Sequence, residues 1–190
     1  NSAVIVNETG DVFKINNNEF DSGGFKLSTT TSLPFPETLQ EPPRAAALPN
    51  GRTAVVIGGE SPRAWVLNAA GQVETDQLLE APIDFNPIPW AGGIVVTSGG
   101  RIRLIQRTSG LPPVEEYAAT SGADQTVHWR SILTVDDEHL IAIDENGKMV
   151  KLQLRQSPSP AHLAEISTVQ LDHPVDVGPV IIDGQLCLAD

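Results

Sequence analysis

The chain has 190 residues, of which 40% are hydrophobic and 19% are charged, so it is long enough to bury a core. Its 24 Asp and Glu residues against 12 Lys and Arg residues give a formal net charge of -12, which repels a phosphate backbone and excludes nucleic acid as an expected partner. No apolar run reaches the roughly 18 residues needed to span a bilayer, and the 16 Gly and 15 Pro residues, spread between short apolar runs, predict many turns and little helix.

Five stretches share one pattern, in which an apolar strand leads into a tight turn and a second apolar strand. In chain order they begin at Ala3 (AVIVNETGDVFKI), Ala54 (AVVIGGESPRAWVL), Gly93 (GIVVTSGGRIRLI), Leu140 (LIAIDENGKMVKL) and Leu186 (LCLAD, the first strand alone). The spacings between these starts are 51, 39, 47 and 46 residues. Gly10, Gly100 and Gly147 occupy equivalent places in the hairpin turns, and Ser61-Pro62 stands there in the second copy. The pattern therefore predicts one repeated β-hairpin.

One long segment interrupts this pattern after the first hairpin. It runs from Asn16 to Pro43, is rich in Asn, Ser, Thr and Pro, and lengthens the first spacing to 51 residues. Segments of this length and composition are typical of surface loops. We expect a mobile loop here.

A second element precedes the hairpins and repeats still more clearly. Leu79–Ile88 (LEAPIDFNPI) and Leu171–Val180 (LDHPVDVGPV) agree as L-[DE]-x-P-[IV]-D-x-x-P-[IV] and lie 92 residues apart, twice the hairpin period. Weaker versions cover Leu39–Leu48 (LQEPPRAAAL) and Asp124–Leu133 (DQTVHWRSIL). Each unit thus contains an apolar strand, a turn, the hairpin and a more polar fourth stretch such as GQVETDQLL or AHLAEISTVQL.

Four strands in about 46 residues have the size of one β-propeller blade, which needs neighbouring blades to cover its faces. We therefore predict an all-β fold, a β-propeller of four-stranded antiparallel blades, with units near 1–38, 39–78, 79–123, 124–170 and 171–190. The chain opens at a second strand and stops after a second strand, so its ends do not complement one another in one blade. We expect four to five blades within a larger propeller; a five-bladed ring with an irregular closing blade is the alternative.

The frames PVIIDGQLCLAD and LIAIDENGKMVKL resemble the pyrroloquinoline quinone-like repeat propellers, whose blades read roughly P-V-V-x-D-G-x-V-Y-V and D-G-x-L-Y-A-L-D. The resemblance covers the whole chain and implies the propeller fold. It departs from the family after Ile15, Ile105 and Leu152, where the Ala-x-Thr-Gly-x-x-x-Trp tail that joins blades in that family is absent. The resemblance therefore implies a fold and not an activity.

Four polar residues occupy corresponding positions in the element that leads into each innermost strand: Arg44, Asp84, His128 and Asp176. In propellers such loops meet at one mouth of the central channel, so the four side chains would form a polar ring that holds a ligand or ion. Alternatively, these residues cap loop backbone groups, as Asp often does in turns. The pair Asp84 and Asp176, two blades apart, could also face each other as an acid and a base for glycoside chemistry.

No catalytic, cofactor-binding or metal-binding residue is predicted. The enzymes of the resembled family hold a quinone with a stacking Trp and a vicinal Cys pair, whereas Cys187 is the single cysteine and Trp65, Trp90 and Trp129 occupy different blade positions. The four His residues lack H-x-H or H-x-x-x-H spacing, and the sequence DENG at 144–147 lacks the distal Glu of a calcium loop, so it is interpreted as a hairpin turn.

These observations favour a non-catalytic propeller that serves as a scaffold for a protein or peptide partner. The alternative is a propeller enzyme or carbohydrate-binding module that uses an acidic channel mouth. The resemblance is to repeats of bacterial extracytoplasmic proteins, and only four Lys residues (Lys14, Lys26, Lys148, Lys151) are present, so a periplasmic or extracellular location is expected.

Overall fold

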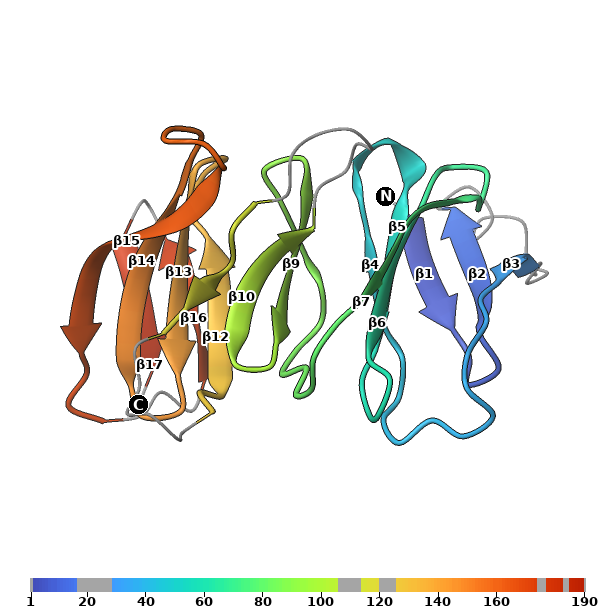
Figure 1. Ribbon diagram of the computed structural model, residues 1–190, viewed down its shortest axis with the longest axis horizontal. Helices are drawn as coiled ribbons and strands as arrows, with labels where there is room; N and C mark the ends of the chain where they lie inside the picture. The colour runs from blue at the N-terminus through green and yellow to red at the C-terminus, as the bar shows by residue number, and fades with distance from the viewer. Residues whose placement is uncertain are drawn as a thin grey trace. The chain divides into compact units, whose positions relative to one another are not determined.

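The computed structural model describes residues 2–16, 29–105, 114–119, 126–173, 177–182 and 185–189. Within these ranges the chain consists of β-strands and one 3-10 turn, η2 (Pro49–Gly51). The strands form antiparallel sheets in which chain neighbours are also sheet neighbours (Figure 1). The chain falls into two compact units, one built mainly from residues 1–81 and the other mainly from residues 90–190. No helix in the described ranges is long and apolar enough to span a membrane.

The first unit contains two sheets. The three-stranded sheet has the order β1 (Ser2–Val6), β2 (Asp11–Asn16) and β3 (Thr29–Ser32), and the four-stranded sheet has the order β4 (Arg44–Ala47), β5 (Thr53–Ile57), β6 (Arg63–Leu67) and β7 (Val73–Leu78). The apolar sequences TAVVI and RAWVL become the central strands β5 and β6, whose residues are buried apart from the half-buried Arg63. The polar sequence VETDQL becomes the edge strand β7.

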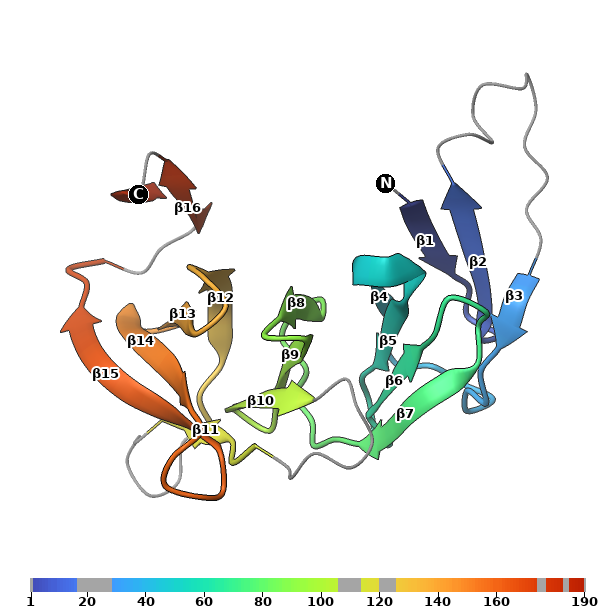
Figure 2. The same cartoon turned by 90° about the horizontal axis from the view of Figure 1, so that it is seen from above.

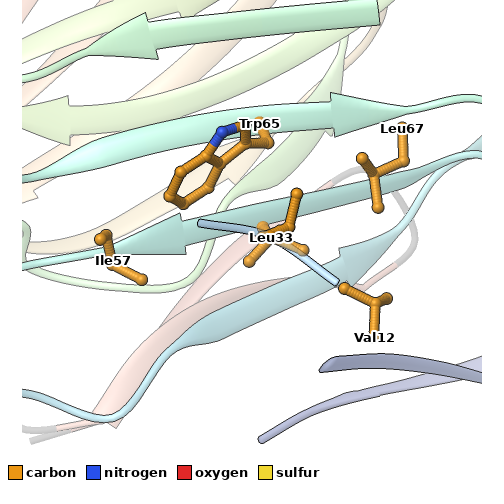
Figure 3. Packing of buried hydrophobic residues seen from close by; sticks show 6 residues of the cluster. Val12, Leu33, Ile57, Trp65 and Leu67 are labelled. Atoms are coloured by element: carbon orange, nitrogen blue, oxygen red, sulfur yellow. The ribbon is translucent and has the colours of Figure 1, made fainter. Parts of the chain in front are cut away.

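The core of the first unit joins these two sheets (Figure 3). Trp65 is fully buried and stacks on Phe35, with ring centroids 5.5 Å apart. The other buried members of the cluster are Val12, Leu33, Val55, Ile57 and Leu67. Because each large apolar side chain contributes about 1.5–3 kcal/mol when it leaves water, this cluster fixes β2 against β5 and β6.

Two members of this cluster correct an expectation from the sequence. Leu33, with 4% of its surface exposed, and Phe35 lie in the Asn16–Pro43 segment that was expected to be a mobile loop. Thr29–Ser32 in the same segment forms strand β3 and pairs with β2. The expectation is therefore wrong for residues 29–35, while residues 17–28 lie outside the described residues.

The second unit contains two further four-stranded sheets and a two-stranded one. The strand order is β8 (Ile88–Trp90), β9 (Gly93–Ser98), β10 (Arg101–Ile105) and β11 (Tyr117–Ala118) in one sheet, and β12 (Trp129–Thr134), β13 (His139–Asp144), β14 (Lys148–Arg155) and β15 (His162–Gln170) in the next. The two-stranded sheet pairs β16 (Val177–Ile182) with β17 (Gln185–Ala189). Figure 2 shows the strands from β12 to β15 following one another across a single twisted sheet.

A repeated backbone hydrogen bond explains the leucine that opens the second sequence element. The amide of Leu79 donates to the Pro62 carbonyl at 2.9 Å, and the amide of Leu171 donates to the Gly147 carbonyl at 2.9 Å. Leu33, which lies outside the predicted copy at 39–48, donates in the same way to the Gly10 carbonyl at 2.8 Å. Each leucine thus ties the end of the last strand of its sheet to the hairpin turn of the same sheet. These turn residues are the positions that the hairpin alignment set as equivalent. The limits of the five units stay a prediction.

Candidate functional site

The element Leu79–Ile88 forms the loop that leads into β8, and this loop is fixed to its own sheet. The amide of Asp84 donates to the Thr97 hydroxyl of β9 at 3.0 Å, and the Gly99 amide donates to the Pro82 carbonyl at 3.1 Å. Two hydrogen bonds to β9 and to the turn that follows it therefore set the direction in which the Asp84 side chain leaves the loop.

The Asp84 carboxylate contacts the following sheet. Its Oδ2 accepts a hydrogen bond from the Trp129 amide at 3.1 Å, and its Oδ1 lies 3.3 Å from Nδ1 of His128. The Asp84 side chain is 9% exposed and the His128 side chain 49% exposed. Two of the four predicted ring residues, from consecutive sheets, thus lie side by side.

This pair has a definite chemistry. A proton on Nδ1 of His128 lets the ring donate to the Asp84 carboxylate, and this hydrogen bond orients the ring. The half-exposed imidazole then offers its other nitrogen as a hydrogen-bonding group. The arrangement can bind a polar group, while the carboxylate itself is largely enclosed.

The other two predicted ring residues are placed less fully. Arg44 begins β4 and its Nη2 lies 3.0 Å from Oε2 of Glu41, with 24% of the Arg44 side chain exposed. Asp176 lies outside the described residues. The ring of Arg44, Asp84, His128 and Asp176 therefore stays a prediction.

The three tryptophans pack in the interior of their units. Trp65 belongs to the core of the first unit. Trp90 donates from Nε1 to the Asp136 carbonyl at 2.6 Å, and Trp129 donates from Nε1 to the Gly100 carbonyl at 2.8 Å. All three are 5% exposed or less. Trp90 and Trp129 therefore join consecutive sheets through indole hydrogen bonds.

No sequence pattern indicated the contacts of Tyr117. Its hydroxyl donates to the Glu165 carboxylate on β15, and its ring lies 6.1 Å from that of Trp129. Burial, followed by this hydrogen bond and the negative charge of Glu165, raises the pKa of the Tyr117 phenol. Tyr117 and Glu165 are 48 positions apart in the sequence, so no local pattern could have predicted the pair.

The DENG sequence forms the predicted hairpin turn. Oδ1 of Asp144 accepts hydrogen bonds from the amides of Asn146 and Lys148, both at 2.8 Å, and Gly147 has a φ of +77°. The carboxylate therefore caps the turn between β13 and β14. Within the described ranges no group of three His, Cys, Asp or Glu residues is arranged to hold a metal ion.

Comparisons with known proteins identify the fold. No family model and no curated protein sequence matches the chain. Among solved structures, it is similar to BamB from Moraxella catarrhalis, with 20% identity and a TM-score of 0.53 over 72% of this chain and 39% of that one. It is also similar to a candidate 6-phosphogluconolactonase from Bacteroides uniformis, with 13% identity and a TM-score of 0.61 over 94% of this chain and 56% of that one.

A third similar structure is that of BBS1N, solved in complex with ARL6DN, with 15% identity and a TM-score of 0.55 over 98% of this chain and 54% of that one. The chain therefore spans less than two thirds of each of these three proteins. Together with the four-stranded antiparallel sheets, the similarities confirm the all-β fold, a β-propeller of four-stranded antiparallel blades. Each four-stranded sheet is a blade with its fourth strand at the outer edge. Counting the sheet β1–β3 as the first blade, the sheets β4–β7, β8–β11 and β12–β15 are the second, third and fourth blades.

Proposed function

We propose that the chain is a non-catalytic β-propeller scaffold that binds a protein or peptide partner at the polar ring of Arg44, Asp84, His128 and Asp176. In this proposal the blades are pyrroloquinoline quinone-like (PQQ-like) repeats that have kept the fold and lost the quinone site. In this proposal each blade contributes one polar side chain to the ring.

The contact between Asp84 and His128 is the observation that carries the proposal. Two residues at the same repeat position in consecutive blades meet at 3.3 Å between Oδ1 and Nδ1. The buried carboxylate holds the imidazole, and the imidazole remains half exposed. A fixed, half-exposed polar group suits recognition of a backbone or polar side chain on a partner.

The same contact weighs against the alternative of a propeller enzyme. A general acid or base must reach the proton that it transfers. The Asp84 carboxylate is 9% exposed and accepts from the Trp129 amide, so it is engaged in joining two blades. A scaffold that binds a partner does not need the Asp84 carboxylate to reach and transfer a proton.

A protein partner also fits one similar structure, because BBS1N was solved in complex with another protein. For this chain we propose a periplasmic or extracellular location in a bacterium, on the grounds of the PQQ-like resemblance and the four Lys residues among 190. Fractionation of the native cells tests this location, and recovery of the protein in the cytoplasmic fraction would contradict it.

Co-purification tests the scaffold function. The tagged full-length protein is purified from its native cells beside an Arg44→Ala/His128→Ala variant and a Glu138→Ala control, whose exposed residue lies in the turn at the far end of β12 from His128. We expect one partner at a fixed molar ratio with the wild type and the control, and its loss from the ring variant. Equal retention by all three proteins would refute binding at the ring.

A substrate screen separates the scaffold from the enzyme. Sugars, esters and alcohols are tested with the wild type and with Asp84→Asn. We expect no turnover above the background of a heat-denatured sample. Turnover by the wild type that disappears in Asp84→Asn would replace the scaffold function with catalysis.

A further inference from the structure

The outer strand of the fourth blade differs from the other outer strands. β15 has nine residues, whereas β7 and β11 have six and two. Propellers ordinarily leave only short, protected edges at the outside of their blades. A long outer strand therefore exposes more unpaired backbone than the fold requires.

β7 and β15 can be compared residue by residue. Each contains a bulge at the same distance from the hairpin turn of its blade, opposite Val66 and Leu67 in β7 and opposite Lys151 and Leu152 in β15. The bulge residue is Glu74 in β7 and Ile166 in β15. Two residues further on, Asp76 of β7 corresponds to Thr168 of β15.

The acidic residues of β7 are held in ion pairs. Glu74 lies 3.1 Å from Nε of Arg52, and Asp76 lies 2.5 Å from Nε of Arg63. Charged side chains on an edge strand discourage the addition of a further strand. β7 therefore carries two charges that protect its edge.

β15 lacks this protection from Ile166 to Gln170, the segment that we name the β15 edge. Its sequence ISTVQ contains no Asp, Glu, Lys, Arg or Pro. Ile166 is 38% exposed and Val169 is 50% exposed. Exposed β-branched residues on an uncharged edge are the features that favour strand addition.

The beginning of the same strand already receives a segment from outside its blade. The Glu115 amide donates to the Ala161 carbonyl at 2.8 Å, the Leu163 amide donates to the Glu115 carbonyl at 3.2 Å, and Glu115 forms a parallel bridge with His162. Beyond Leu163, no strand in the described ranges pairs with the outer side of β15. The backbone of β15 is therefore suited to an added strand, and no described residue occupies the outer side of the β15 edge.

Local charge indicates the occupant. Lys148 and Lys151 lie on β14 opposite Gln170 and Ser167, and neither forms a salt bridge within the described ranges. A strand added to β15 would lie about 10 Å from β14, two strand spacings away. Lysine carries its charge at the end of a long, flexible side chain, so both ammonium groups can come within about 8 Å of an added strand, the distance over which charges act at physiological ionic strength. Acidic side chains on the added strand would complement them.

We propose that the β15 edge binds an extended, acidic segment of a partner protein by strand addition, with β-branched residues of the segment alternating with Asp or Glu. A second copy of this chain is disfavoured, because pairing two β15 edges would bring two pairs of lysines together. The site is separate from the polar ring and does not rest on it.

A designed peptide tests the proposal with the full chain. The probe is a fluorescein-labelled ten-residue peptide of alternating Val and Glu, followed by fluorescence anisotropy, and the comparison probe carries Lys in place of Glu. We expect saturable binding of the Glu peptide and at least about tenfold weaker binding of the Lys peptide. Absence of saturable binding, or equal binding of both peptides, would overturn the proposal.

Exchange of residues between the two edges provides matched variants. Ile166→Glu/Thr168→Asp gives β15 the acidic residues of β7, and both positions lie on an exposed outer strand, so circular dichroism should confirm folding. We expect this variant to lose binding of the Glu peptide at least about tenfold. The reciprocal Glu74→Ile/Asp76→Thr variant leaves β15 intact and should bind at least as well as the wild type. Unchanged binding by Ile166→Glu/Thr168→Asp would refute the β15 edge as the site.

Two further measurements distinguish the β15 edge from the polar ring and from a contact between two copies of the chain. His128→Ala should leave peptide binding unchanged, whereas the partner captured at the ring should be unaffected by Ile166→Glu/Thr168→Asp. Sedimentation tests self-association of the chain: a monomer is expected. A wild-type dimer that the Ile166→Glu/Thr168→Asp variant abolishes would show that the edge takes a second copy and would contradict the proposal.

Discussion

The indole Nε1 of Trp129 donates a hydrogen bond to the carbonyl oxygen of Gly100 at 2.8 Å, so the innermost strand of the fourth blade is joined to the hairpin turn of the third. The same stretch of chain supplies the Trp129 amide to Asp84. Trp129 therefore joins the fourth blade to the third at two places, the hairpin turn at Gly100 and the loop that carries Asp84. Consecutive blades in the second unit are held by directed polar contacts as well as by apolar packing.

Replacement of Trp129 by Phe should measure this contact. The change removes the indole donor and leaves the Gly100 carbonyl without that partner, which costs about 1–3 kcal/mol in addition to the lost packing. Trp65→Phe is the matched control, because the buried Trp65 Nε1 has no hydrogen-bond partner among the described residues, so this change removes only packing. Urea unfolding should therefore show a larger loss of stability for Trp129→Phe. Equal losses would show that the hydrogen bond contributes nothing measurable.

Gly100 should not tolerate a side chain. Its φ is +77°, and a Cβ atom would lie 2.9 Å from the Val127 carbonyl oxygen. Gly100→Ala should therefore cost about 1–2 kcal/mol for the left-handed backbone and about 1–3 kcal/mol more for the clash. Gly92 has a φ of +74° with no atom within 4 Å of its Cβ position, so Gly92→Ala carries the backbone cost alone. The difference in thermal stability between the two variants isolates the cost of the contact between the added Cβ atom and Val127. Equal losses of stability in the two variants would contradict that cost.

The pH dependence of Tyr117 should be visible by absorbance, because it is the single tyrosine in the chain. Burial and the Glu165 hydrogen bond raise its pKa above the ordinary value of 10.0. The folded protein should therefore show little phenolate absorbance at 295 nm at pH 10.5, and urea should release it. Glu165→Gln should lower the pKa of Tyr117 towards its ordinary value.

The same shift predicts a change in stability with pH. The folded state holds the Tyr117 phenol proton more tightly than the unfolded state. The contribution of this group to the free energy of unfolding is therefore complete below pH 10 and is lost as the pH rises further towards the folded-state pKa. Urea unfolding between pH 9 and pH 11.5 should show a steeper fall for the wild type than for Tyr117→Phe. Parallel curves for the two proteins would contradict the shift.

Ile143 on the central strand β13 should be a core position. Its side chain is fully buried, and the residue lies opposite Ser131 and Met149 in the neighbouring strands. Ile143→Ala should cost about 2–4 kcal/mol in the free energy of unfolding. Glu145→Ala, in the adjacent turn, should cost less than about 0.5 kcal/mol, because the Glu145 hydrogen bond to His128 uses the backbone. A small effect at Ile143 would place β13 outside the core.

The sequence was informative where the structure depends on local chemistry. The Asn146-Gly147 pair and the apolar runs around it predicted a hairpin, because Gly adopts the positive φ that such a turn needs. The leucine of the second element had no assigned role, yet its repetition reflects a repeated amide hydrogen bond to a turn carbonyl. Regular spacing of both features was enough to predict four-stranded blades.

Features that depend on tertiary contacts could not be predicted. β3 has the polar sequence TTTS, without apolar alternation, and it forms a strand because β2 offers a partner. The alignment placed Asp84 and His128 at the same position in successive blades, but not their direct contact. Nor could it show that the Asp84 carboxylate would also accept the Trp129 amide. Such contacts depend on how blades pack, which no local pattern records.

Site-specific photocrosslinking in the native cells tests the scaffold function most directly. A photoreactive amino acid replaces Arg44, His128 or Asp176 in separate proteins, and in a control it replaces the exposed Glu138, in the turn at the far end of β12 from His128. We expect one crosslinked partner, the same for all three ring positions, which the control does not capture. Different partners at the three positions, or a partner captured equally at Glu138, would contradict a single binding surface formed by the ring.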